Sequence, residues 1–342
     1  MEWLYMYMPI AGMKILWPGL VLIGFSVGTI GGFFGMGGAW MVTPGLNILG
    51  FPMAFAIGTD MAHIAGKSMI STFRHSKFGN VDYKLGFIMI IGTMAGIELG
   101  AQLVMYLEKL GNVGTVVRWS YVVLLMLIAT MVFYDYYKAT KKKNAGEVGE
   151  HGAEGITWYK TLHKIKIPPM IHFKAAGFTC SAWIPIGVSF LTGVLAGFLG
   201  IGGGLIRMPA LVYLIGCPTH IAVGTDLFEV MISGLYGAFT YALKGRIELV
   251  AVFVMLTGAA IGAQIGTIAT KYAKGYGIRV AFGLAVLCCM ISIILKEYKF
   301  DVASAVIILG TIGLICIYII GIMVNGAREE LRAKKLAKPV TA

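Results

Sequence analysis

Three ionisable side chains interrupt an otherwise apolar stretch near residues 53–73. Asp60, His63 and Lys67 are three and four residues apart, so a helix would carry all three on one face. A charged group at membrane depth costs at least about 2.5–3.5 kcal/mol on insertion scales, so such residues mark a function or a paired cavity. Lys67 is a candidate point charge for an anion, while Asp60 and His63 could relay protons or balance the cation.

A second set of ionisable residues follows in the other half of the chain. Arg207 lies in a short apolar segment, and Asp226 and Glu229 share one face of the next apolar stretch. The planar fork of Arg207 suits an oxyanion, and the two acids could couple protons or balance charge. The alternative is a structural ion pair between Arg207 and either acid. For Thr59 and Thr225, which precede the first acid of each set, two roles are open: donation to a substrate, or a bond to the backbone.

Two glycine clusters, at residues 35–38 and 200–204, break apolar stretches. Lipid cannot satisfy a broken backbone, so each break should face protein or a water-filled cavity. Short apolar segments follow at 40–49 and 205–215, and the free N–H groups at the start of each would point into that cavity. Two such ends, converging from opposite membrane sides, would form an anion pocket near the midplane; close helix packing is the alternative. The glycines expected to line the pocket are Gly37, Gly38, Gly202, Gly203 and Gly204.

An internal repeat relates the two halves of the chain. Residues 31–102 are similar to residues 197–268; the offset is 165 at the two glycine clusters and becomes 166 after one inserted residue. The triplet at 58–60 falls on the identical triplet at 224–226, so the first acid of each set is duplicated. Two glycine ladders also coincide and predict close helix contacts, with Gly92, Gly96 and Gly100 falling on Gly258, Gly262 and Gly266. So many matches with one gap indicate a duplication.

The elements that must position these residues are long apolar segments. Of the 342 residues, 58% are hydrophobic and 13% are charged, which excludes a water-soluble fold of this size as well as a disordered chain. The sequence predicts an all-α polytopic membrane protein with two inverted repeats, about nine long membrane helices and two short ones at the glycine-rich motifs. The nine stretches are 15–34, 53–73, 85–107, 116–137, 183–200, 219–243, 247–270, 277–295 and 302–324.

Basic residues concentrate between Lys138 and Lys174 and again after Asn325. In a membrane protein this favours a cytoplasmic location over a nucleic-acid site. Counting helices outward from the basic linker gives the two repeats opposite topologies, which is typical of secondary transporters. Within the linker, the stretch after residue 156 is either an amphipathic surface helix or a plain connector. The expected regions are a first repeat at 1–138, a basic cytoplasmic linker at 139–176, a second, inverted repeat at 177–300, and a last membrane helix with a basic cytoplasmic tail at 301–342.

The sequence resembles the TauE/SafE sulfite exporter family, also called the toluene-sulfonate uptake permease family. The resemblance is carried by GFFGMGGAWMVTP and GFLGIGGGLIRMP, by LGFPMAFAIGTD and IGCPTHIAVGTD, and by HSKFGNVDYKLG. It implies a membrane carrier, usually an exporter, for sulfur oxyanions such as sulfite, sulfate, thiosulfate or sulfoacetate, with no catalytic turnover and no bound cofactor. Ala39 and Trp40 replace the third glycine and the aliphatic residue often found in the family, so the resemblance does not transfer a particular substrate.

We therefore expect a multi-pass transporter of the cytoplasmic membrane that works by alternating access, with its anion near Arg207 and Lys67. The expected partners are a small sulfur oxyanion and the lipid bilayer, with protons as a candidate coupling ion. No nucleic acid, cofactor, metal or enzyme activity is expected, and the oligomeric state is not predicted. Two alternatives remain: an anion channel of the same fold, and a membrane redox subunit. The latter needs paired His ligands at depth, and only His63 and His220 lie near apolar stretches.

Overall fold

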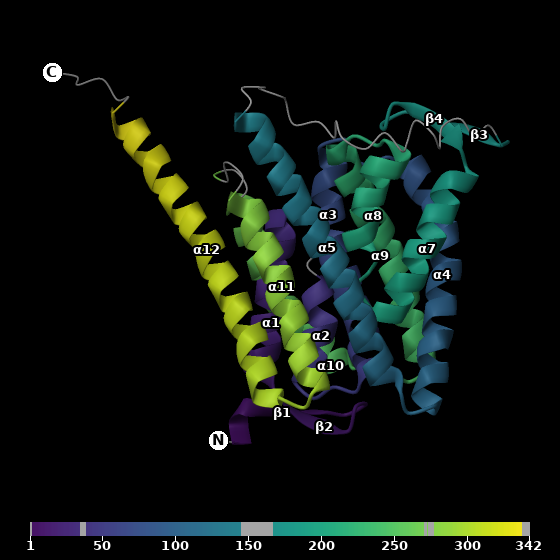
Figure 1. Ribbon diagram of the computed structural model, residues 1–342, viewed down its shortest axis with the longest axis vertical. Coiled ribbons are helices and arrows are strands. Elements are labelled where there is room, and N and C mark those ends of the chain that lie inside the picture. The colour runs from purple at the N-terminus through teal and green to yellow at the C-terminus, as the bar shows by residue number, and fades with distance from the viewer. Residues whose placement is uncertain (1, 35–38, 145–166, 270–271, 273–276, 337–342) are drawn as a thin grey trace.

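The computed structural model is a bundle of helices that run along the height of the molecule (Figure 1). It describes residues 2–34, 39–144, 167–269, 272 and 277–336. The helices of the first half are α1 (Trp17–Phe34), α2 (Val42–Ile48), α3 (Met53–Lys77), α4 (Tyr83–Lys109) and α5 (Val113–Asn144). Those that follow are α7 (Trp183–Leu199), α8 (Gly204–Ala210), α9 (Thr219–Leu243), α10 (Leu249–Ala269), α11 (Gly277–Glu297) and α12 (Asp301–Leu336). The predicted all-α membrane fold is confirmed at this level.

Length and apolar character divide the described helices into groups. Six of them are long and apolar enough to cross a membrane, namely α4, α5, α9, α10, α11 and α12. Helices α1 and α7 are apolar but shorter. Helix α3 has 25 residues but is less apolar than these, because Asp60, His63 and Lys67 lie in it. Each of the nine predicted stretches overlaps one helix over most of its length, although 15–34 begins in the strand Met13–Leu16 and 247–270 begins before α10. Length and composition alone support a membrane crossing for six of these helices.

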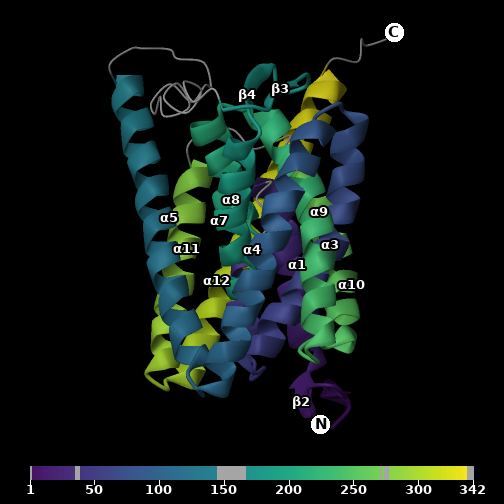
Figure 2. The same ribbon diagram turned by 90° about the vertical axis from the view of Figure 1, so that its right-hand side faces the viewer.

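Two β-hairpins, which the sequence analysis did not predict, precede α1 and α7. Strand β1 (Tyr5–Met8) pairs antiparallel with β2 (Met13–Leu16), and β3 (Met170–Phe173) pairs antiparallel with β4 (Phe178–Ser181). The strands of the second hairpin lie 165 residues after those of the first, the same offset as the internal repeat. Figures 1 and 2 show the hairpins at opposite ends of the molecule. The duplicated unit therefore begins earlier than the sequence motifs indicated.

The basic linker expected at 139–176 does not coincide with one structural element. Helix α5 extends through Asn144, so the linker begins within a helix. Residues 145–166, which include most of the candidate surface helix, lie outside the described residues. The end of the linker forms strand β3, and the expected boundary at residue 177 falls in the turn of the second hairpin.

Helices from the two halves pack together in equivalent pairs. Helix α1 lies against α10, and α4 lies against α7; α3 packs on α9, and α5 on α11 (Figure 2). A Cβ atom at Gly96 would collide with the backbone of Phe190 in α7, and one at Gly262 would collide with the backbone of Phe25 in α1. The glycine ladders thus allow direct backbone contact between helices, as small residues do in membrane bundles.

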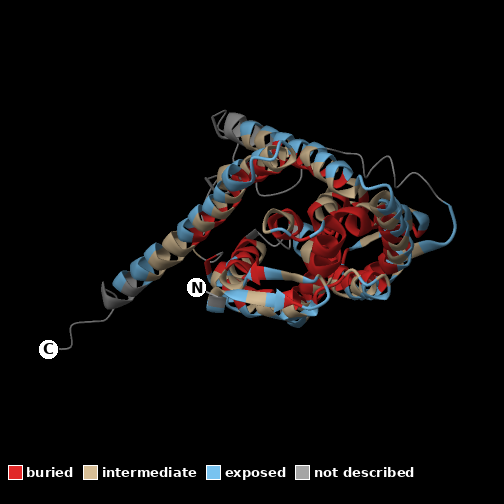
Figure 3. Ribbon diagram, turned by 90° about the horizontal axis from the view of Figure 1, so that it is seen from below, coloured by how far each residue is buried: buried red, intermediate tan, exposed pale blue. Residues whose placement is uncertain are grey.

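Buried residues gather in the middle of the bundle, whereas α12 is mostly intermediate or exposed (Figure 3). Helix α12 packs against α11, α1 and α10. Its last turn lies at the same end of the molecule as the β3–β4 hairpin, opposite the β1–β2 hairpin (Figure 1). The end of the basic linker and the start of the basic tail therefore share one end of the molecule.

Candidate functional site

The charged residues predicted in the second half form a compact group, called here the α8–α9 cluster (Arg207, Asp226 and Glu229). The Arg207 guanidinium is fully buried and forms ion pairs with Glu229 and with Asp226, the latter at 3.4 Å between Nη1 and Oδ1. Its Nε donates to the hydroxyl of Thr192 at 3.2 Å. Within the described part of the chain, Nη2 of Arg207 and Oε1 of Glu229 have no hydrogen-bond partner. Of the two roles considered for Arg207, these contacts fit the structural ion pair, and two carboxylates already balance its charge.

The charged residues predicted in the first half form the α3 cluster (Asp60, His63 and Lys67), and all three are buried. Oδ2 of Asp60 accepts hydrogen bonds from the backbone N–H and the hydroxyl of Thr43 in α2, at 3.1 and 2.8 Å. Oδ1 of Asp60 lies 3.8 Å from Nδ1 of His63. Among the described residues, neither ring nitrogen of His63 has a hydrogen-bond partner, and Nζ of Lys67 has neither an acceptor nor an ion pair. The α3 cluster therefore contains buried nitrogen atoms that make no hydrogen bond to the described residues.

Two further hydroxyls on α3, those of Ser68 and Thr72, are buried without partners among the residues that the structure describes. They lie on the stripe of the helix beside Lys67, four residues apart. The neighbouring Ala65 contacts Gly234 of α9, so this side of the helix faces α9. The sequence analysis missed both hydroxyls, because a serine or threonine in an apolar helix usually bonds its own backbone and gives no distinct signal.

The second glycine cluster adopts a backbone that requires glycine. Gly200 ends α7 with φ +80°, and Gly202 and Gly203 have φ values of +64° and +77°. L-residues with a side chain disfavour this left-handed region by about 1–2 kcal/mol each. Gly37 and Gly38 of the first cluster lie outside the described residues. The backbone argument for an open glycine turn therefore rests on the second cluster.

This glycine turn lies between the two charged clusters. A Cβ atom at Gly200 would come within 2.6 Å of the Thr43 hydroxyl, which binds Asp60. A Cβ atom at Gly204 would come within 2.8 Å of Oδ2 of Asp226. The turn thus brings together parts of both halves that are far apart in the sequence. Substitutions here would affect both clusters at once.

The duplicated threonines bind backbone across the two halves. Oγ1 of Thr59 accepts a hydrogen bond from the backbone N–H of Glu248 at 3.1 Å, and Oγ1 of Thr225 accepts one from the backbone N–H of Asp82 at 2.9 Å. All four residues are buried. Of the two roles left open for the threonines, these hydrogen bonds fit the bond to the backbone.

The same two acids also hold the hairpins. Oδ2 of Asp82 accepts hydrogen bonds from the backbone N–H groups of residues 175–176, both at 3.1 Å. Oε2 of Glu248 accepts hydrogen bonds from the backbone N–H groups of residues 10–11, at 2.8 and 2.9 Å. Each acid therefore fastens the hairpin of the other half. We call Thr59, Asp82, Thr225 and Glu248 the crossed clasp.

Other charges near the apolar stretches pair at helix ends. Glu98 of α4 lies 3.3 Å from Nζ of Lys244, and both carboxylate oxygens of Glu108 lie 3.0 Å from Nε of Arg246. All four side chains are partly exposed. Glu98, an acid within the apolar stretch 85–107, therefore belongs to a partly exposed ion pair and not to either buried cluster.

Two cysteines outside the membrane-spanning helices are buried beside the second hairpin. Burial raises the pKa of the Cys180 thiol in β4 to about 11. Burial, with a smaller effect of the Asp82 carboxylate, raises the pKa of the Cys217 thiol to about 12. Both thiols are therefore protonated at neutral pH and pack as small apolar groups. In the described part of the chain, His, Cys, Asp and Glu side chains form no group of three that could hold a metal ion.

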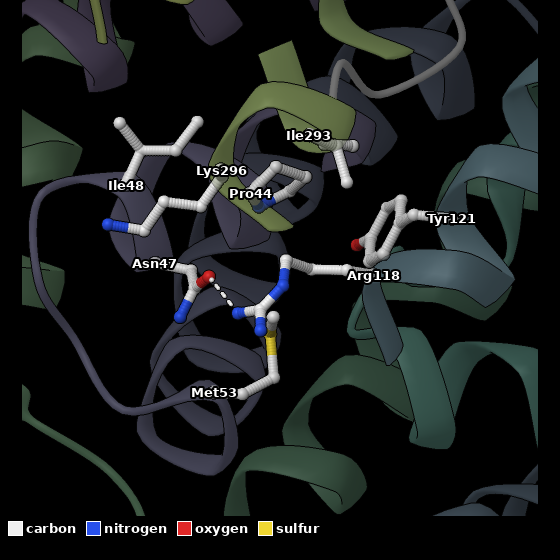
Figure 4. Close-up of a pocket in the computed structure, with 8 residues that line it drawn as sticks. All are labelled: Pro44, Asn47, Ile48, Met53, Arg118, Tyr121, Ile293 and Lys296. Atoms are coloured by element: carbon white, nitrogen blue, oxygen red, sulfur yellow. Dashed lines mark hydrogen bonds between the residues drawn. The ribbon is translucent and has the colours of Figure 1, made fainter. Parts of the chain in front are cut away.

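A small cavity lies between α2, α5 and α11 (Figure 4). Its volume is about 10 Å³, which is room for about one water molecule. Arg118 lines one side and donates to Oδ1 of Asn47 at 3.2 Å. Tyr121, one turn further along α5, and Pro44 of α2 also line the cavity, and Pro44 follows Thr43, the partner of Asp60. The cavity is therefore a small, mostly apolar space beside α2, and Met53 at the start of α3 also lines it.

Comparisons of the sequence with known proteins identify a family and relatives named as membrane transporters. Residues 20–293 match the family model described as "Sulfite exporter TauE/SafE". The probable membrane transporter protein YunE of Bacillus subtilis (strain 168) is 26% identical over 255 residues, which cover 72% of this chain and 86% of that protein. A probable membrane transporter protein of Xylella fastidiosa (strain 9a5c) is 25% identical over 287 residues, covering 82% and 95%. No solved structure gives a significant match.

Proposed function

Because the chain belongs to the TauE/SafE sulfite exporter family, we propose that it carries small sulfur oxyanions across the cytoplasmic membrane as a secondary transporter. Sulfite, sulfate, thiosulfate and sulfoacetate are the candidate substrates, and export is the proposed direction. Multiple apolar helices and curated relatives named as probable membrane transporters support the general part of this proposal.

The ammonium of Lys67, unpaired among the described residues, is the observation that carries the anion part of the proposal. Asp60 interacts with this cation only at longer range, and a buried cation without a close counter-ion favours an anion that can approach it. An oxyanion beside Lys67 would supply that charge and accept a hydrogen bond from Nζ. His63, whose ring nitrogens also lack partners in the described part of the chain, could donate a second bond to the same anion.

In this proposal the other predicted residues have supporting roles. The backbone of Gly202, Gly203 and Gly204 lets the anion approach without meeting a Cβ atom, and Gly37 and Gly38 would do so from the first half. Arg207 offers Nη2, while its charge stays balanced by the acids beside it. Thr59 and Thr225 shape the site through the crossed clasp, without touching the anion.

Proton or charge coupling is proposed for Asp60, His63, Asp226 and Glu229. Each is buried, and each lies in one of the two clusters beside the glycine turn. A carboxylate that takes up a proton there would change the net charge around the anion and hence its affinity. Asp226→Asn should then flatten the pH dependence of transport, measured as initial rates between about pH 5.5 and 8.5.

We infer that transport proceeds by alternating access between two inverted repeats. The hairpins related by the repeat offset lie at opposite ends of the molecule, which supports opposite topologies. Equivalent helix pairs, α1 with α10 and α7 with α4, support a two-fold relation between the halves. Rocking of one repeat against the other would open the central site to one side at a time.

Counterflow in proteoliposomes tests the function. Liposomes containing the purified protein are loaded with unlabelled sulfite and diluted into labelled sulfite, sulfate, thiosulfate, sulfoacetate or acetate. Saturable accumulation of a sulfur oxyanion, driven by unlabelled anion inside, is the expected result. Flux that rises linearly with concentration and shows no counterflow would indicate a channel instead. Uptake of acetate alone would contradict the substrate class.

A further inference from the structure

A cleft at the end of the molecule lies apart from both charged clusters. It is lined by residues 81–84, where α4 begins, and by His172, Lys174 and Ala175 of the β3–β4 hairpin. Its volume is about 240 Å³, which admits a small polar group but not a large ligand. None of the described residues that line this cleft belongs to the proposed anion site or to the proposed coupling residues.

The cleft carries positive charge that the described residues do not neutralise. Lys84 and Lys174 are exposed and form no ion pair with the described residues; Nζ of Lys84 donates to the backbone carbonyl of His172 at 3.4 Å. His172 shares Nδ1 with the Thr179 hydroxyl at 2.9 Å, which leaves its other ring nitrogen for a ligand. The two ammonium groups and one imidazole therefore converge on the same space.

Asp82, the one carboxylate among the described residues that line the cleft, is already engaged. It accepts hydrogen bonds from the backbone N–H groups of Leu85 and of residues 175–176. Three N–H donors stabilise this carboxylate, and its side chain is fixed in the crossed clasp. Asp82 is therefore not available as a counter-ion for Lys84 and Lys174.

Exposed aromatic and apolar side chains lie on the elements at this end of the molecule, and one of them, Tyr83, lines the cleft. Phe78, Tyr83, Met170 and Trp183 all expose much of their surface, and the indole N–H of Trp183 donates to the backbone carbonyl of Pro168 at 3.1 Å. Tryptophan and tyrosine are enriched at the boundary between lipid tails and headgroups. The cleft thus lies at the depth where phospholipid headgroups are found.

The other half of the molecule supplies an internal comparison. At the repeat offsets, Lys84 corresponds to Val250, His172 to Tyr7 and Lys174 to Pro9. The scaffold of hairpin, helix start and clasp is repeated, but all three basic positions are apolar or uncharged at the opposite end. The positive charge is therefore an addition to one copy and not a requirement of the fold.

From the cleft, its charge and its depth, we infer that it binds the phosphodiester of an anionic phospholipid headgroup. Lys84 and Lys174 would contact the phosphate oxygens from the two sides of the cleft, and His172 would donate a further hydrogen bond. Free inorganic phosphate offers the same oxygens, so the test must separate the two sources.

The test measures lipid retention by the full-length protein. Wild type, Lys84→Gln/Lys174→Gln and Lys14→Gln are purified in detergent and titrated with phosphatidylglycerol, phosphatidylcholine or inorganic phosphate, while bound species are counted by native mass spectrometry. Lys14 is exposed on β2, in the hairpin at the opposite end, and is the matched control. Size-exclusion profiles verify that each variant is folded.

The affinity for phosphatidylglycerol should be the same in wild type and Lys14→Gln. It should be about thirtyfold lower in the double variant, as expected for the loss of two lysines near an anionic headgroup. Phosphatidylcholine should bind all three alike. Equal phosphatidylglycerol binding by the double variant would overturn the assignment. Competition by millimolar inorganic phosphate with no preference for phosphatidylglycerol would also overturn it, in favour of a free-phosphate site.

Discussion

The α3 cluster and the α8–α9 cluster occupy equivalent positions in the repeat but differ in how their charges are satisfied. Asp60 and Asp226 are duplicates, yet His63 corresponds to Glu229 and Lys67 to Ser233. In the second half Arg207 is paired with both acids, and the Ser233 hydroxyl donates to Glu229 at 3.4 Å. In the first half Asp60 binds Thr43, and Lys67 has no partner among the described residues.

This difference is the basis for proposing a structural role for the α8–α9 cluster and a binding role for the α3 cluster. A cation balanced by two carboxylates holds helices together, because removal of any member leaves a charge unpaired. A buried cation with no hydrogen-bond acceptor and no close ion pair among the described residues is costly to the fold, which fits the binding role proposed for Lys67. The two halves thus share equivalent helices, but the charged residues on those helices differ, and we propose different roles for them. Removing the cation should therefore have opposite effects on stability in the two halves.

The largest effect is expected at Arg207. Arg207→Met should lower the free energy of unfolding by about 3–5 kcal/mol, because Asp226 and Glu229 are left buried without their cation. The midpoint of thermal unfolding in detergent measures it. Arg207→Met/Glu229→Gln should recover part of the loss, since one unpaired charge is removed. A midpoint unchanged in the single variant would show that the ion pairs are not structural.

Lys67→Gln should lower sulfur-oxyanion flux by about tenfold to a hundredfold, the value of roughly 1.5–3 kcal/mol for a hydrogen bond to a charged group. Without substrate, its unfolding midpoint should stay the same or rise, because an unpaired buried charge is gone. Flux in proteoliposomes and thermal unfolding are measured on the same samples. Lys77→Gln, an exposed lysine at the end of the same helix, is the control and should leave both quantities unchanged. If Lys67→Gln destabilises as strongly as Arg207→Met, the contrast between the clusters fails.

The crossed clasp should respond symmetrically. Thr59→Val and Thr225→Val each leave one buried backbone N–H without an acceptor, so each should cost about 1–3 kcal/mol of stability. Because the hydrogen bonds are equivalent, the two losses should agree within about 0.5 kcal/mol, measured by thermal unfolding. A large loss of unfolding free energy in only one of the two variants would mean that the two hydrogen bonds do not contribute equally to stability.

The smallest effect is expected in the hairpin turns. Gly12 and Gly177 have φ values of +66° and +74°, and a Cβ atom at either would meet nothing within 4 Å. Alanine at either position should therefore cost only the backbone term of about 1–2 kcal/mol. Gly310→Ala in α12, where φ is not positive and space is open, is the control and should not destabilise. The midpoints of thermal unfolding of the three variants, each compared with wild type, measure these differences in stability.

The sequence located the helices and the charged residues well, for a physical reason. Apolar stretches interrupted by Asp60, Lys67 or Arg207 stand out because membrane depth penalises charge, so both the helices and the candidate site follow from local composition. The four-residue strands gave no comparable signal. Their alternation is short, and the turn before Gly12 is built from apolar residues.

The partners of the site residues could not be predicted. Thr43 and Thr192 are ordinary hydroxyl residues in apolar stretches, and they become ligands of Asp60 and Arg207 only when α2 and α7 are packed. The same holds for Asp82 and Glu248: their alignment in the repeat was visible, but not that each would bind the hairpin of the other half.

The amino-acid sequence by itself determined the class of protein, the duplication and which residues carry charge into the membrane, because these depend on composition and on spacing along one segment. Only the tertiary structure decided which charges are satisfied. Pairing depends on contacts between segments more than a hundred residues apart, as between Glu248 and the first hairpin, or on a turn such as the one before α8. Arg207 and Lys67 look alike in the sequence, but packing pairs Arg207 with two carboxylates and gives Lys67 no close partner among the described residues, which is why we propose the anion site at Lys67.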